Sequence, residues 1–185
     1  CVGSHVQTFY LDTVIGKMSK VFSAEECDLP PLAHGFDRGH LVEAFNDIYT
    51  ESAPGIERVP IEGLYPKEEL YPFEEAKLYG HNTTHFLLAA LLHARGCRYM
   101  DEASENPDAL DVARHVLVDE CGAALCTKHS GVDPFFAPDA FRQFAHGLVD
   151  RMTSPVLHDS VERVVRDPER KLGWNDRMIG ALRLC

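Results

Sequence analysis

The sequence lacks the features that would place it in a membrane, send it across one, or bind it to nucleic acid. No apolar run approaches the roughly 20 residues that a membrane-spanning helix needs, and no basic segment followed by an apolar one marks a secretory signal. The formal net charge is −11, and no basic stripe with interleaved aromatic residues is present, so a nucleic-acid backbone would be repelled. We therefore expect a cytoplasmic protein that has neither a membrane nor a nucleic acid as its partner.

Common cofactor and metal motifs are missing as well. None of the six cysteines belongs to a C-x2-C pair and no H-E-x-x-H occurs, so neither a zinc knuckle nor a metalloprotease site is indicated. The cysteines are expected to be free thiols in a reducing compartment. No G-x-G-x-x-G follows a strand-like segment, so the phosphate-binding turn of a Rossmann fold is absent.

What is present is typical of one soluble, mainly helical domain. The 185 residues are 45% apolar and 25% charged, which is enough to bury a core without disulfides or metals. The spacing of apolar residues predicts helices over about 73–94, 109–128, 138–152, 160–166 and 174–184. Residues 9–22 also have near-helical spacing, whereas two short apolar segments near 41–61, interrupted by Pro and Gly, are interpreted as strands or extended arms.

The most informative segment is the start of the longest predicted helix. After His85 this helix is almost wholly apolar, as expected of a buried helix, but its first turns carry Lys77, His81 and Asn82. At about 100° per residue, these side chains and that of Glu74 fall within an arc of about 140°. One helix face therefore carries a potential acid/base, an amide donor and two imidazoles. An exposed polar face that ends where the helix enters the core would give the same spacing, so the pattern alone leaves both interpretations open.

The residues around this face resemble those of a known enzyme family. The segment 73–85 is similar to the catalytic segment of the polyol-specific long-chain dehydrogenases, in which a lysine is followed five residues on by an asparagine and three further on by a histidine, as Lys77, Asn82 and His85 are here. That family comprises mannitol dehydrogenases, mannitol-1-phosphate 5-dehydrogenases and sugar-acid reductases. The basic segment 160–172 resembles a second family segment, and the likeness continues in the same order over nearly the whole chain.

The resemblance covers only the family's C-terminal substrate domain, and it implies a mainly α-helical fold like the C-terminal domain of 6-phosphogluconate dehydrogenase. Residues 1–185 would form that single domain, and NAD or NADP would be bound by an N-terminal Rossmann domain outside this chain. The family uses no metal. The chain starts at Cys1 rather than at Met and ends within a helical pattern, so we expect that both ends are truncated and that the chain alone is inactive.

By the same resemblance, Lys77 would be the acid/base that takes the proton of a substrate hydroxyl, which requires its pKa to fall well below about 10.4. Asn82 would stabilise the developing oxyanion and His85 would bind a substrate hydroxyl. An amide that holds a loop and a satisfied core histidine are the alternatives for these two residues. Glu74 matches a family glutamate that is linked to proton passage between the active site and solvent. An ordinary residue on the helix surface is the interpretation that we favour for it. His81 and His85 would supply half of a metal site, but no third ligand is evident.

A basic cluster stands out in this acidic chain, and its members are Arg163, Arg166, Arg170, Lys171 and Arg177. A solvated helix face is the ordinary interpretation of such a cluster. By the resemblance, Arg163 and Lys171 match positions near the substrate, and guanidinium groups suit hydroxyls, carboxylates or phosphate. The density of cations favours a polyol phosphate over a free polyol, with Arg166 and Arg170 as additional substrate ligands.

Together these features predict the substrate domain of an NAD(P)-dependent dehydrogenase with a small-molecule substrate. The enzyme would interconvert mannitol 1-phosphate, or mannitol itself, and the ketose. A domain of a hexuronate reductase and a cofactor-free helical binding module are the alternatives.

Overall fold

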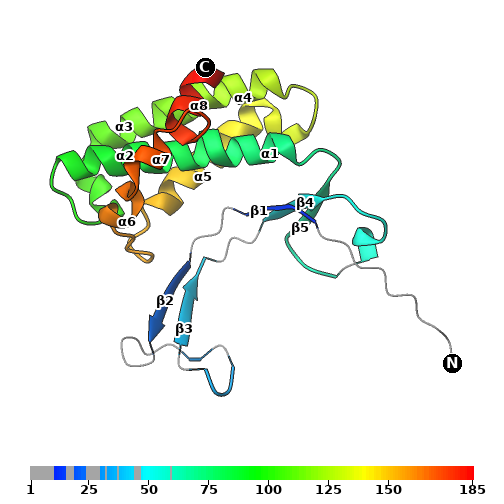
Figure 1. Cartoon of the computed structure of the whole chain (residues 1–185), viewed down its shortest axis with the longest axis horizontal. Helices are drawn as coiled ribbons and strands as arrows, with labels where there is room; N and C mark the ends of the chain where they lie inside the picture. The colour runs from blue at the N-terminus through cyan, green and yellow to red at the C-terminus, as the bar shows by residue number, and fades with distance from the viewer. Residues whose placement is uncertain are drawn as a thin grey trace.

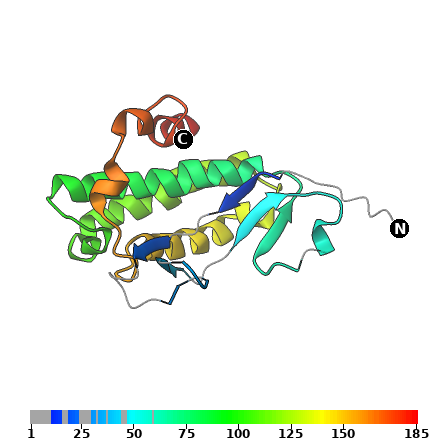
Figure 2. The ribbon, with the colours of Figure 1, turned by 60° about the horizontal axis from the view of Figure 1, so that its bottom comes forward.

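A computed structural model of the chain describes residues 11–15, 19–23, 30–31, 33–36, 38–43, 47–58 and 60–185. These residues form a β-containing N-terminal part and a larger helical body (Figures 1 and 2). The mainly helical fold predicted from the sequence is confirmed. Among the described residues, no helix is both long enough and apolar enough to cross a membrane.

Two small sheets form the N-terminal part. Strand β4 (Ile48–Glu51) pairs with β1 (Thr13–Ile15) in antiparallel and with β5 (Leu64–Lys67) in parallel orientation. Strand β2 (Ser19–Ser23) pairs antiparallel with β3 (Arg38–Val42). The extended segment expected near 41–61 is therefore confirmed for β3 and β4.

Two expectations for this part are wrong in detail. Within the range 9–22, residues 13–15 and 19–22 form strands and not a helix. The β-branched sequence of β1 fits a half-buried strand edge better than it fits a helix. Residues 9–10 and 16–18 lie outside the described residues. Of the two apolar segments expected to be extended near 41–61, the second contains instead a 3₁₀ turn, η1 (Ile56–Arg58).

The longest helical run changes its winding twice. It begins as α1 (Tyr71–Glu75), continues as the π-helical segment η2 (Ala76–Asn82), and ends as α2 (Thr83–Ala94). Pro72 lies in the first turn, where its missing N–H leaves no hydrogen bond unmade. Gly96 follows the run with φ +79°, the left-handed conformation that glycine adopts most easily at a helix end.

A second long run lies antiparallel to the first (Figure 1). After the 3₁₀ segment η3 (Met100–Glu105) it consists of α3 (Pro107–His115), the π-helical segment η4 (Val116–Gly122) and α4 (Ala123–Lys128). The two π-helical segments contact each other. After the short η5 (Pro134–Phe136), helix α5 (Pro138–Met152) covers the range predicted from apolar spacing.

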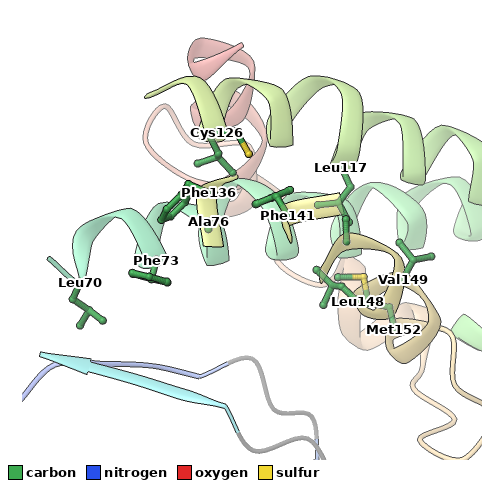
Figure 3. Packing of buried hydrophobic residues seen from close by; sticks show 12 residues of the cluster. Leu70, Phe73, Ala76, Leu117, Cys126, Phe136, Phe141, Leu148, Val149 and Met152 are labelled. Atoms are coloured by element: carbon green, nitrogen blue, oxygen red, sulfur yellow. The ribbon is translucent and has the colours of Figure 1, made fainter. Parts of the chain in front are cut away.

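The core consists of two clusters of buried side chains. The larger cluster joins the α1–η2 junction to η4, η5 and α5, and Figure 3 shows Ala76 beside Phe136 and Phe141 beside Leu117. The smaller cluster joins α2, η3 and α3 to the C-terminal part, and its largest members are Leu88, Leu92, Met100 and Val161. An apolar face on each side of the long run therefore holds it in place.

Three short helices complete the body: α6 (Val161–Val165), α7 (Pro168–Lys171) and α8 (Arg177–Leu184). Helix α6 packs on α2, and α8 packs on η2. Gly180 permits the second contact, because a Cβ added there would lie 2.4 Å from the ring of Tyr79. The basic segment of the sequence is thereby laid beside the polar start of the long run.

Candidate active site

The π winding of η2 groups the polar side chains more closely than the expected α-helix would. In a π-helix residue i is hydrogen-bonded to residue i+5, so Lys77 and Asn82 lie nearly one above the other. In an α-helix they would be about 140° apart. The expectation of a uniform α-helix is wrong for these seven residues. Such π-helical turns are rare and occur frequently at functional sites.

These side chains line an open pocket of about 380 Å³ between η2–α2 and the C-terminal helices. The structure brings Lys77, Asn82 and His85 together in its wall, as their spacing predicts. The remaining lining residues, most of them charged, are His81, Arg163, Val164, Arg166, Asp167, Arg170, Lys171 and Arg177. The two sequence segments that carry the family resemblance therefore meet in one concavity.

The ammonium group of Lys77 is in an environment that favours its neutral form. Burial is the main cause, and the positive charges of Arg151 and Arg177 add to it, while Glu43 opposes them; the pKa falls from 10.5 to about 8. The Nζ atom lies 2.9 Å from Nδ1 of His81. A lysine that loses its proton near neutral pH meets the electrostatic requirement for a general base. The catalytic role itself stays a prediction.

The imidazole of His85 is buried next to a carboxylate. Its Nε2 lies 3.6 Å from Oδ2 of Asp159 and has no hydrogen-bond partner within the described part of the chain. Burial lowers the pKa of His85 to about 4 although Asp159 opposes the shift, so we treat this contact as one with a neutral ring. The carboxylate has another partner, because Arg163 binds Asp159 through Nε, at 2.6 Å, and Nη2.

The predicted substrate-binding cations differ in their surroundings. Arg170 donates to Asp167 at 2.7 Å and to Asp176 at 3.1 Å. Lys171 is buried, and its Nζ donates to the backbone carbonyls of Val164 and Arg166. The exposed Arg166 side chain makes no ion pair with any residue that the structure describes.

The pocket keeps an excess of positive charge despite these pairs. Six cationic side chains line it, and the carboxylates that lie in its wall or pair with it are Asp159, Asp167 and Asp176. An anionic group on a ligand would therefore be attracted to the pocket. Within the described residues, no three His, Cys, Asp or Glu side chains are placed to hold a metal ion.

Glu74 is the one predicted site residue that the structure does not bring to the pocket. Its side chain is exposed and does not belong to the pocket wall, so its role in proton passage stays a prediction. The neighbouring Glu75 is buried instead, and its carboxylate lies 2.7 Å from both Lys128 and His129. That cluster ties the start of the long run to the end of α4.

Sequence reasoning missed the residues that reach the site from a distance. Arg151 on α5 and Glu43 after β3 form an ion pair with a 2.7 Å contact, and both act on the pKa of Lys77. Asp159 contacts His85 from the loop before α6. No local pattern marks these residues, whereas Arg177 lies in the basic cluster and was recognisable as a member of it.

Comparison with known proteins identifies the family. Residues 69–185 match the family described as Mannitol dehydrogenase C-terminal domain. Mannitol-1-phosphate 5-dehydrogenase of Brevibacillus brevis is 34% identical over 146 residues, which are 78% of this chain and 36% of that protein. The enzyme of the same name from Lactiplantibacillus plantarum is 32% identical over 126 residues, 68% of this chain and 31% of that protein. The chain thus spans about a third of the length of these relatives.

A solved structure has a similar fold. The mannitol 2-dehydrogenase of Pseudomonas fluorescens, determined as a ternary complex with NAD and D-mannitol, matches 80% of this chain and 30% of its own chain with a TM-score of 0.53 and 20% identity. This likeness concerns the fold alone. Because the family match extends over more than half of the residues, this chain belongs to the mannitol dehydrogenase family and contains its C-terminal domain.

Proposed function

We propose that this chain supplies the substrate-binding and proton-transfer part of an NAD(P)-dependent polyol or polyol-phosphate dehydrogenase. One observation carries the proposal: Lys77, Asn82 and His85 extend from one helical run into a single polar pocket whose surroundings lower the pKa of the lysine. The names of the sequence relatives support a polyol or its phosphate as the substrate. Mannitol 1-phosphate and mannitol are the substrates we favour.

In this proposal the neutral amine of Lys77 accepts the proton of the substrate hydroxyl as the adjacent carbon loses hydride. The side-chain amide of Asn82 donates to the same oxygen while its charge develops. His85, which lines the same pocket, holds a neighbouring hydroxyl. The reverse reaction uses the ammonium form of Lys77 as the acid.

The cofactor belongs to a part of the enzyme outside these residues. A bound nicotinamide would accept the hydride. The sequence contains no Gly-rich turn between strand and helix, so we assign NAD or NADP to an N-terminal Rossmann domain. The residues of this chain would bind and orient the polyol and would move its proton.

The charge of the pocket favours a phosphorylated substrate. Arg163 and Arg170 already hold carboxylates, whereas Arg166 has no such partner among the described residues. A phosphate could form charge-assisted hydrogen bonds with Arg166, each contributing about 1.5–3 kcal/mol. A hexuronate, with a single carboxylate, is the second substrate class that this charge would suit.

The proposal is tested by joining this chain to the N-terminal part of the Brevibacillus brevis relative and measuring mannitol 1-phosphate oxidation. Lys77→Ala is expected to lower kcat by about a hundredfold or more, the contribution of a general base. His93→Ala changes an exposed histidine at the other end of the same run and should leave kcat unchanged. Full activity of Lys77→Ala would refute the proposal.

A further inference from the structure

His81 has a place in the pocket that the proposed reaction leaves without a role. It follows Lys77 by four residues in η2, is 3% exposed, and brings Nδ1 to 2.9 Å from the lysine Nζ. Both side chains line the open pocket on one side and a small cavity of about 30 Å³ on the other. The pair therefore forms the wall that separates the pocket from the interior.

We infer that His81 is a positioning residue for Lys77, whose Nδ1 accepts a hydrogen bond from the lysine and so directs the amine lone pair into the pocket. This inference rests on the proposed function, in which Lys77 is the base. It concerns a residue that neither accepts the substrate proton nor binds the substrate. Its effect would reach the reaction only through the orientation of Nζ.

The two neutral tautomers of His81 would have opposite consequences. If Nδ1 carried the hydrogen, it would donate to the lone pair of the neutral lysine and occupy the electrons that the substrate proton needs. If Nε2 carries the hydrogen, Nδ1 accepts from Nζ and the lone pair stays free. A charged lysine has only donors, so the second tautomer suits both forms of Lys77. The same hydrogen bond can then persist throughout the proton transfer, without reorganisation.

The surroundings keep His81 neutral, as this role requires. Burial is the main cause that holds the pKa of His81 well below its usual value, and the positive charge of Lys77 follows. The other groups that lower this pKa come from three further elements and are His85, Arg151 and Arg177. Asp47 also lies in the wall of the small cavity and has the opposite charge. In a neutral imidazole that carries its proton on Nε2, Nδ1 is an acceptor, whereas an imidazolium would have no acceptor.

The interior side fixes the ring in place. The cavity behind it has room for about one water molecule, and Phe73, Phe135 and Phe144 form much of its wall. The ring of His81 also meets that of His85 edge-on, with centroids 6.1 Å apart. A side chain packed on several sides loses little further freedom when it holds the lysine, which favours a defined direction for Nζ.

The kinetic test uses the joined protein described above and two substitutions of similar size. His81→Leu removes the acceptor, and kcat for mannitol 1-phosphate is expected to fall about tenfold or more with KM changed by less than about twofold. His81→Asn places an amide oxygen near the position of Nδ1, and should restore kcat to within about threefold. Equal losses in the two variants would overturn the inference, since packing alone would then explain them.

A second measurement needs no cofactor domain. Nitrogen chemical shifts of His81 in the ¹⁵N-labelled chain should show the neutral tautomer protonated at Nε2 near neutral pH. An Nδ1-protonated ring, or an imidazolium, would overturn the inference. Lys77→Ala distinguishes failure of the proposed function from failure of the role of His81. If Lys77→Ala is fully active, the proposed function fails. If Lys77→Ala is inactive and His81→Leu is fully active, only the role of His81 is rejected.

Discussion

The ion pair between Arg151 and Glu43 offers a direct test of how the fold sets the basicity of Lys77. Arg151 lowers the pKa of Lys77 and Glu43 raises it, although the two side chains are bound to each other at 2.7 Å. Removal of one charge should therefore shift the pKa in one direction, and removal of the other should shift it in the opposite direction.

The magnitude follows from the size of the whole shift. A fall in pKa from 10.5 to about 8 corresponds to about 3 kcal/mol. Burial is the largest cause, and two arginines share the rest, so the loss of Arg151 should raise the pKa of Lys77 by roughly one unit. Near neutral pH the neutral fraction of the lysine would then fall from roughly a tenth to roughly a hundredth.

The assay is the pH dependence of kcat/KM in the joined protein. Arg151→Gln should shift the acid limb upward by about one pH unit and lower kcat/KM near neutral pH about tenfold, while the alkaline plateau stays unchanged. Glu43→Gln should shift the same limb downward. The double variant should lie between them, and Arg142→Gln, on the exposed side of α5, should not shift it.

Several results would refute this reasoning. An acid limb that stays in place in both single variants would mean that neither charge acts on the titrating base. A loss of kcat/KM that is equal at every pH would point to altered packing, because breaking a partly buried ion pair also destabilises the fold by several kcal/mol. Thermal unfolding of each variant should therefore accompany the kinetics.

Three further predictions concern stability, substrate and cofactor. The pKa of Lys77 is lower in the folded than in the unfolded state, so the lysine destabilises the fold fully below about pH 8 and progressively less up to about pH 10.5. Lys77→Met should therefore raise the free energy of unfolding near neutral pH by about 1–3 kcal/mol. A lower Tm in this variant would contradict the prediction. Arg166→Ala should raise KM for mannitol 1-phosphate about tenfold, or about 1.4 kcal/mol, with little change for mannitol; equal effects on both substrates would return Arg166 to the role of a surface charge. The 185-residue chain alone should bind NADH too weakly for calorimetry, and a micromolar affinity would show that it contains a nucleotide site.

The parts of the fold that were predictable have strong local signals. Helix α5 begins at Pro138 and ends at Met152, the limits that its apolar spacing and its proline indicate. The π winding at Lys77 was not predictable, because the apolar spacing of the run as a whole fits the α-helical period of 3.6 residues. Strand β1 was mistaken for helix because three residues with a half-exposed pattern give little periodicity to analyse.

The same distinction holds for the candidate site. Lys77, Asn82 and His85 lie within nine residues of sequence, so a short motif was enough to group them. Arg151 and Glu43 lie 108 residues apart, and only the packing of α5 against the N-terminal part brings them to Lys77. Tertiary contacts of this kind supply much of the electrostatic environment, and one sequence without relatives contains no signal for them.

The π winding of η2 and η4 has a consequence for insertions and deletions in this chain. Each π-helical turn takes up about one residue more than an α-helical turn does. A one-residue deletion in η2 would convert that turn to an α-helical one and leave α2 in phase with α1. The packing of α2 on α3 and the bond from Glu75 to Lys128 would then keep their register. We therefore expect each π-helical segment to accept the loss of one residue, whereas the same deletion within α2 would turn the rest of that helix by about 100°.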